Sequence, residues 1–202
     1  MPDPACFLAA AALAAASTAA ARQAAPPGAS IRAEFRVFDG TSEVSGVTRL
    51  RVRLSGSTET GIVVEGSDLA LDLKAGIYDV QAIRQESGHL VSVRWAEHLV
   101  IMAYPDEAGR HLEVINFSNQ FGALQLKWSG GRTPDPAGVT VTVSKPGDSH
   151  PSAAHPLRGA GYLLLVLPAG TYDVHVAQPG RPDVTLSAME LPPDRTRMKL
   201  IQ

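Results

Sequence analysis

The fold is decided by the stretch Leu167-Pro168-Ala169-Gly170-Thr171-Tyr172-Asp173-Val174. The stretch Leu73-Lys74-Ala75-Gly76-Ile77-Tyr78-Asp79-Val80 repeats its pattern 94 residues earlier, counted from Leu73 to Leu167. In both copies an apolar run stops at a turn that contains glycine, and a tyrosine then opens a new alternating run. This pattern predicts two β-strands joined by a turn, and its recurrence predicts a tandem repeat.

Three further anchors follow in the same order in both halves of the chain. The pairs are Gly46-Val47-Thr48 with Gly138-Val139-Thr140, Pro105-Asp106 with Pro193-Asp194, and Leu112-Glu113-Val114-Ile115 with Met198-Lys199-Leu200-Ile201. A shared order of anchors is the signature of a duplicated unit. We therefore predict a first repeat over residues 31–118 and a second over residues 119–202.

Each half consists of short apolar runs separated by glycine and proline turns, with no helical periodicity. In the first half, residues 31–37 and 46–54 alternate apolar and polar side chains, and residues 90–95 and 98–103 are expected to form separate short strands. Short strands at this spacing are typical of β-sandwiches. The sequence predicts an all-β protein of two tandem immunoglobulin-like β-sandwiches.

The composition excludes several classes of protein. Of the 202 residues, 45% are hydrophobic and 19% are charged, which excludes wholesale disorder. The net charge of −2 provides no basic field for nucleic acid. The single cysteine, Cys6, lies before the folded part, so disulfides and cysteine-based zinc sites are excluded there.

Residues 1–30 form a leader and a linker. Residues 5–21 are uncharged and rich in alanine, and they end at Ala19-Ala20-Ala21 before Arg22. This pattern predicts an export signal, although Asp3 stands where a basic segment is usual. A true start further upstream and an alanine-rich tail are the alternatives. The run is too short and too weakly apolar for a membrane span, so we expect a periplasmic, cell-surface or secreted protein.

The second half, in which Gly138-Val139-Thr140-Val141-Thr142-Val143 precedes the Pro168–Val174 corner, resembles the carboxypeptidase regulatory-like and prealbumin-like (transthyretin-like) modules of bacterial exported proteins. The first half is similar but more divergent. The resemblance implies non-catalytic modules that present or bind a protein or a glycan, and it transfers no ligand residue. Gly76, Tyr78, Gly170 and Tyr172 are predicted to form structural corners, in which each tyrosine inserts its ring into the core and bonds a backbone group.

An arginine row is the most distinctive predicted surface feature. Arg49, Arg51 and Arg53 alternate with core residues on one strand, and Arg32 and Arg36 are expected on a strand that could lie beside it. The row could bind an anionic partner, or it could be a solvated sheet face paired with Glu34 or Glu43, which is the interpretation we favour. The second repeat carries Thr140, Thr142 and Ser144 at the matching positions, so the fold does not require arginine there.

The segment from Arg94 to Glu107 is richer in polar and aromatic residues than its counterpart in the second repeat. Within it, Trp95, His98 and Tyr104 are candidate binding residues. Trp95 and Trp128 could stack on a sugar ring, but we interpret both as core or inter-domain packing.

Motifs for catalysis are absent from the sequence. The histidines do not form a His-Glu-x-x-His pair, and neither a Gly-x-Ser-x-Gly elbow nor a nucleotide-binding glycine loop occurs. Asp79 and Asp173 border turns and are expected to face solvent, and Asn116-Phe117-Ser118 matches the glycosylation pattern. We predict no catalytic residue, metal or cofactor. The six histidines are His89, His98, His111, His150, His155 and His175.

The sequence thus predicts an exported, non-catalytic accessory module that binds a protein or a cell-surface glycan. Two alternatives remain open. One is a small metal-dependent hydrolase that uses His98 and His111 of the first repeat with nearby carboxylates. The other is an assembly subunit that pairs through exposed edge strands.

Overall fold

The computed structural model describes residues 30–103, 110–128, 138–148, 150–159 and 161–201. The leader up to residue 29, the candidate Tyr104 and the Pro105-Asp106 anchor lie outside the described residues.

Strands make up nearly all of the regular structure of the described residues, and the 3-10 turn Ser45–Val47 (η1) precedes β3. The strands up to the middle of the chain are β1 (Ile31–Asp39), β2 (Ser42–Glu43), β3 (Thr48–Leu54), β4 (Ile62–Val64), β5 (Ala70–Leu73), β6 (Gly76–Glu86), β7 (His89–Ile101) and β8 (Arg110–Asn116). The later strands are β9 (Phe121–Trp128), β10 (Thr140–Ser144), β11 (Ser152–Ala154), β12 (Leu157–Gly159), β13 (Tyr162–Pro168), β14 (Gly170–Ala177), β15 (Val184–Leu191) and β16 (Thr196–Ile201).

These strands form two sandwiches with the same arrangement of strands, except that β2 pairs with β1 whereas β12 pairs with β13. In the first, β1 pairs with β2, β5 and β8, and the opposing sheet has the order β4-β3-β6-β7. In the second, the corresponding sheets have the orders β12-β13-β9-β16 and β11-β10-β14-β15. The first and last strands of each sandwich, β1 with β8 and β9 with β16, run parallel. The predicted fold class, all-β with two tandem sandwiches, is confirmed, and we propose residues 31–118 and 119–202 as the two domains.

The repeated corner has the same geometry in both sandwiches. The hydroxyl of Tyr78 donates a hydrogen bond to the carbonyl of Lys74 (3.0 Å), and that of Tyr172 donates to the carbonyl of Pro168 (2.8 Å). Both tyrosines are buried members of their sandwich cores. Burial raises the pKa of both phenols. Each tyrosine therefore ties the turn that precedes it to the core.

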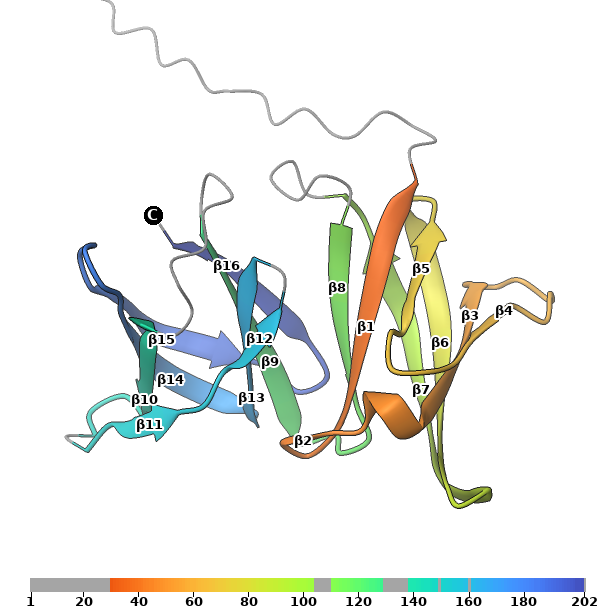
Figure 1. Ribbon diagram of the computed structural model, residues 1–202, viewed down its shortest axis with the longest axis horizontal. Coiled ribbons are helices and arrows are strands. Elements are labelled where there is room, and N and C mark those ends of the chain that lie inside the picture. Colours follow the sequence, from red (N-terminus) through yellow and green to blue (C-terminus); the bar gives the residue numbers. More distant parts are fainter. Residues whose placement is uncertain (1–29, 104–109, 129–137, 149, 160, 202) are drawn as a thin grey trace, which may run out of the picture.

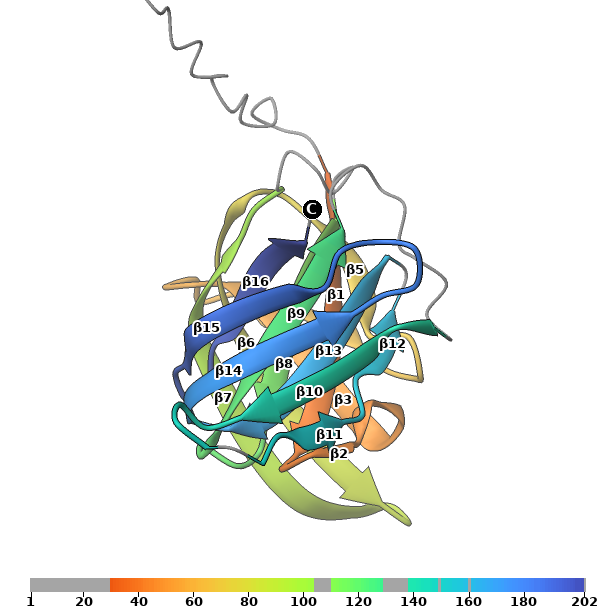
Figure 2. The same cartoon turned by 90° about the vertical axis from the view of Figure 1, so that its left-hand side faces the viewer.

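The two sandwiches pack sheet against sheet, so that the molecule has four layers (Figure 1). Between the two inner sheets lies a third apolar cluster, in which Phe38 and Leu112 of the first sandwich meet Ala123, Tyr162 and Leu164 of the second. Figure 2 shows the outer sheet of the second sandwich in front of its inner sheet. A short segment, residues 117–120, connects the two sandwiches.

Polar contacts surround this inter-domain cluster. Tyr162 donates a hydrogen bond to Glu34 Oε1 (2.7 Å), and burial and this hydrogen bond raise the pKa of the tyrosine. The backbone N–H of Val114 donates to Thr196 Oγ1 across the interface (3.2 Å). The sandwiches are therefore joined by apolar packing and by directed hydrogen bonds.

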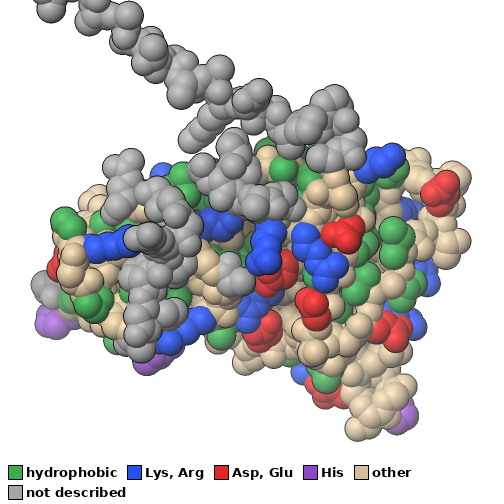
Figure 3. All heavy atoms as spheres, turned by 45° about the horizontal axis from the view of Figure 1, so that its top comes forward, with side chains coloured by type: hydrophobic (Ala, Val, Ile, Leu, Met, Phe, Trp, Pro, Cys, Tyr) green, Lys and Arg blue, Asp and Glu red, His purple; other side chains and the backbone are tan. Residues whose placement is uncertain are grey.

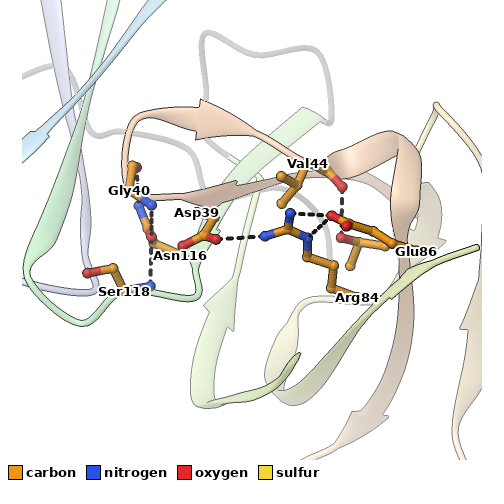
Figure 4. A network of polar contacts seen from close by, with 8 residues as sticks. Asp39, Gly40, Val44, Arg84, Glu86, Asn116 and Ser118 are labelled. Carbon is orange, nitrogen blue, oxygen red and sulfur yellow. Dashed lines mark hydrogen bonds and ion pairs between the residues drawn. The ribbon is translucent and has the colours of Figure 1, made fainter. Parts of the chain in front are cut away.

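Asn116 fixes the junction between the two sandwiches (Figure 4). Its Oδ1 accepts hydrogen bonds from the backbone N–H of Gly40 (3.1 Å) and of Ser118 (2.9 Å), and its Nδ2 donates to the carbonyl of Gly40 (2.7 Å). Arg84 lies beside this junction and pairs with Glu86 and with Asp39. Because Asn116 is buried and its amide is occupied, its place in the glycosylation pattern does not make it a modification site.

One element differs from the sequence prediction. Residues 90–95 and 98–103, expected as separate strands, belong mainly to the continuous strand β7, which ends at Ile101. The break that the sequence suggested is a β-bulge, where the register against β6 shifts between Tyr78 and Val80. A bulge bends a strand without ending it.

We predict that Asn116→Ala destabilises the protein by about 1–3 kcal/mol, because it removes a buried amide and leaves part-buried backbone groups of Gly40 and Ser118 without their partner. Asn119→Ala is the matched control, since Asn119 is exposed in the same connecting segment. Urea unfolding of both variants measures the difference. Equal stability of the two variants would contradict the role assigned to Asn116.

Candidate functional site

The candidate binding residues of the first repeat that the structure describes lie on the β4-β3-β6-β7 sheet, and the arginines and Trp95 share its outer face. Leu50 and Val52 of β3 point into the core, so the alternating arginines of β3 point outward. Arg51 lies opposite Gln81 of β6, and Gln81 lies opposite Trp95 of β7. We call this surface the arginine–tryptophan face; its residues are Arg49, Arg51, Arg53, Gln81, Val93 and Trp95.

Trp95 is the exposed aromatic residue of this face. It is 41% exposed, and the guanidinium carbon of Arg53 lies 5.2 Å from the centroid of its ring. This distance is within the range of a cation–π contact. The packing interpretation is therefore wrong for Trp95. It is correct for Trp128, which is buried in the second core and donates from Nε1 to Gln178 Oε1 (2.7 Å).

Acidic neighbours neutralise part of the arginine row. Arg49 lies 3.5 Å from Glu65, and Arg53 lies 3.6 Å from Asp79. For Arg51, the described residues provide no ion-pair partner. The face therefore keeps about one unpaired positive charge. It offers little attraction to a strongly anionic ligand.

Arg32 and Arg36 do not extend the row. They lie on β1, which belongs to the inner sheet, whereas β3 pairs with β4 and β6. The possibility that their strand lies beside that of the row is therefore wrong. Arg36 instead makes hydrogen bonds to both carboxylate oxygens of Glu43 (2.9 and 2.5 Å), one of the two pairings that the sequence suggested.

His98 and Asp79 meet at the bulge on this sheet. The backbone N–H of His98, at a φ of 57°, donates to Asp79 Oδ1 (3.2 Å). Asp79 is only 6% exposed, so the expectation that it faces solvent is wrong. The hydrogen bond from His98 lowers the pKa of the Asp79 carboxyl against the opposing effect of burial, with help from Ser55 and Arg53.

The second sandwich repeats this bulge. The backbone N–H of Ala188, at a φ of 50°, donates to Asp173 Oδ1 (2.7 Å). Asp79 and Asp173 thus accept the same hydrogen bond at the same bulge. In each sandwich the donor is a residue whose backbone lies in the left-handed region. The repeated Tyr-Asp-Val triplet was the sequence signal for this structural role.

The second sandwich lacks the chemistry of the arginine–tryptophan face. Trp95 pairs with Gln81 in the first sandwich, and Thr185 pairs with His175 at the same place in the second. Arg51 has its counterpart in Thr142, which also pairs with His175. The fold therefore tolerates small residues at both positions, and the first sandwich alone carries the large ones.

The histidines do not form a metal site within the part of the chain that the structure describes. No group of three or more His, Cys, Asp or Glu residues there could hold a metal ion. His111 is buried, and its ring nitrogens lie 3.0 Å from the carbonyl of Met102 and 3.0 Å from Glu113 Oε1. His98 is exposed at the bulge. The geometry gives the hydrolase alternative no metal centre among these residues.

Charge is mixed on the surface that Figure 3 presents. Basic and acidic side chains lie beside one another across the middle of this view. The described part of the chain contains no helix with the length and hydrophobicity of a membrane span.

Comparison with known proteins gave distant structural likenesses only. No family model and no curated protein matches the chain. The Bacillus anthracis TIE protein is 11% identical with a TM-score of 0.31, over 86% of this chain and 34% of that one, so the chain spans about a third of its length. The minor pilin GBS52 of Streptococcus agalactiae is 14% identical with a TM-score of 0.30, over 85% and 94% of the two chains. The tip fimbrial protein Mfa3 of Porphyromonas gingivalis is 7% identical with a TM-score of 0.31, over 78% and 81%.

Scores of this size assign no function to the chain, so its function has to be inferred from its own residues. None of these three structures is described as a carboxypeptidase regulatory-like or prealbumin-like module, so that resemblance stays a prediction.

We predict that the charge of Asp79 stabilises the fold at neutral pH and ceases to do so in acid. Its pKa is lowered in the folded protein, so its contribution is fully present above the ordinary aspartate pKa of about 4 and is lost as the pH falls through the lowered value. Unfolding free energies of the wild type and of Asp79→Asn should therefore differ at neutral pH and converge in acid. Asp68→Asn, at an exposed ion pair with Arg32, is the control and should change stability by less than about 1 kcal/mol. A difference for Asp79→Asn that does not change with pH would refute the prediction.

Proposed function

We propose that this protein is an exported, non-catalytic binding module that engages a protein or a cell-surface glycan through the arginine–tryptophan face. The observation that carries the proposal is the exposed Trp95, held beside Arg53 on a face where the second sandwich places threonine. Tryptophan and arginine are the residues that most often dominate binding energy at interfaces.

The alternation of β7 supports the same proposal. In a strand that covers a core, apolar side chains face inward and polar ones face solvent. In β7, Val93 and Trp95 face outward and are 45% and 41% exposed, whereas Arg94 is paired with the core residue Ala82 and points the other way. This reversal exposes apolar side chains to water in the free protein, which is unfavourable. A partner that covers the face explains it.

The edge-strand alternative is less favoured by the structure. β7 is the edge of its sheet and is 13 residues long, which could template pairing with another chain. However, the bulge at His98 interrupts its regular edge, and the inward-pointing Arg94 is bound to Asp194 of the second sandwich (2.5 Å). Bulges and inward-pointing charges are features that discourage edge pairing.

We predict that binding to material from the native cell envelope depends on this face. Envelope protein and envelope glycan fractions are immobilised separately, and binding of the purified protein is measured on each. Trp95→Thr, which installs the residue of the second sandwich, should weaken binding by about tenfold or more, as expected for a central interface residue.

The matched control is Thr185→Ala at the equivalent position of the second sandwich, which should bind as the wild type does. Unchanged binding by Trp95→Thr, with the fold intact by circular dichroism, would contradict the proposal.

We predict export with loss of the leader. Intact mass of the native protein from its own host should show removal of the residues up to about Ala21, with recovery outside the cytoplasm. An uncleaved cytoplasmic protein would contradict the export part of the proposal and leave the binding face to be tested separately.

A further inference from the structure

A polar cleft of about 290 Å³ opens where the second sandwich meets the edge of the first. Strand β7 provides Trp95 and Glu97, strand β8 provides Val114–Asn116, and the turn between β15 and β16 provides Pro193–Arg195. Neither sandwich forms this cleft alone. It lies beside the arginine–tryptophan face, and Trp95, whose ring lies on that face beside Arg53, also borders the cleft.

The walls of the cleft are held in place by an ion pair and by hydrogen bonds. Arg94 and Asp194 bridge it with an ion pair of 2.5 Å. The N–H of Val114 is bonded to Thr196, and Asn116 is fixed to Gly40. A cleft that is organised before its ligand arrives loses little entropy on binding.

The charges in the cleft balance. Arg94 and Arg195 contribute two positive charges, and Glu97 and Asp194 contribute two negative ones. The side chains of Glu97 and Arg195 have no ion-pair partner among the residues that the structure describes. The cleft therefore offers an open carboxylate acceptor and an open guanidinium donor, without a net field that would favour a strongly charged ligand.

We propose that this cleft binds a neutral carbohydrate of one or two sugar rings. Sugar hydroxyls both donate and accept hydrogen bonds, which matches a carboxylate beside a guanidinium, and the apolar face of a sugar ring matches Trp95. The volume is at the lower limit of about 300 Å³ for small-molecule pockets. The polar lining disfavours a lipid, and the balanced charge disfavours a phosphate. The inference rests on the proposed function, because it names the ligand class that Trp95 meets.

The second sandwich supports this assignment as an internal comparison. Counting along β15 from the shared bulge, Val184, Thr185 and Ser187 stand in the places of Arg94, Trp95 and Glu97. The common fold therefore requires none of these three side chains. Their presence in the first sandwich alone marks the cleft as a specialised feature.

The experiment uses the exposed tryptophan as the reporter. Trp95 is 41% exposed and Trp128 only 4%, so acrylamide quenching of the full-length protein reports mainly on Trp95. The probes are the methyl glycosides of glucose, galactose, mannose and N-acetylglucosamine, with methyl glucuronide as the charged counterpart. At least one neutral glycoside should protect Trp95 from acrylamide in a saturable manner at millimolar concentration.

Glu97→Ser, which installs the residue of the second sandwich, should weaken this protection by about tenfold, as expected for loss of one charge-assisted hydrogen bond. Glu190→Ser, the same substitution at an exposed position of β15 that does not line the cleft, should leave it unchanged. Near-ultraviolet circular dichroism checks that both variants are folded.

Three results would overturn the inference: no protection by any neutral glycoside, protection by the glucuronide alone, or protection that survives Glu97→Ser. The proposed function is tested independently. If no glycoside protects Trp95 but Trp95→Thr abolishes envelope binding, the binding module stands and the cleft assignment is wrong. If Trp95→Thr binds the envelope as the wild type does, the proposed function is wrong whatever the glycosides show.

Discussion

The packing of the two inner sheets against each other is the constraint on which the rest of the structure depends. Phe38 and Leu164 are fully buried between them, and Leu112 is nearly so. Each inner sheet is therefore covered on both faces, by its own sandwich core and by the other sandwich. Since a sheet with two buried faces needs apolar residues on both, this packing explains the continuous apolar run Leu163–Leu167. Its odd positions enter the second core, and its even positions enter the interface.

The same constraint limits where a partner can bind. With the inner sheets covered, the described strands leave a broad sheet face free only on the two outermost sheets. The open sides of the sandwiches are the other accessible surfaces. The outer sheet of the first sandwich carries three arginines on β3 and Trp95 on β7. The matching strands of the second sandwich, β10 and β15, carry threonine and serine there. The fixed contact between the sandwiches also creates the cleft, because Asp194 of one is brought to Arg94 of the other. The exposure of the proposed binding face and the formation of the cleft thus both depend on how the two sandwiches are joined.

Much of the fold follows from the sequence alone. The duplicated corner, the alternating runs and the absence of helical periodicity are local properties, and local patterns specify strands and turns. The tyrosine corners required only the repeated Tyr-Asp-Val. The burial of Asp79 and the exposure of Trp95 were not predictable in this way. Alternation says which side chains share a face, but not which face is covered, and a bulge reverses the alternation partway along a strand. In β7, Val93 and Trp95 alternate with polar residues as core residues do, but both lie on the outside of the sandwich.

The duplication itself separates residues that the fold needs from residues that it does not. Tyr78, Gly76 and Asp79 have counterparts in Tyr172, Gly170 and Asp173 that make matching contacts, so their shared geometry is explained by the corner and the bulge. Arg94, Trp95 and Glu97 have counterparts of different chemistry in the same backbone positions. A solvated sheet face would be served equally well by the threonine and serine of the second sandwich. The first sandwich instead exposes Val93 and Trp95 together on one face, and this asymmetry is the strongest physical reason for proposing that a partner binds there.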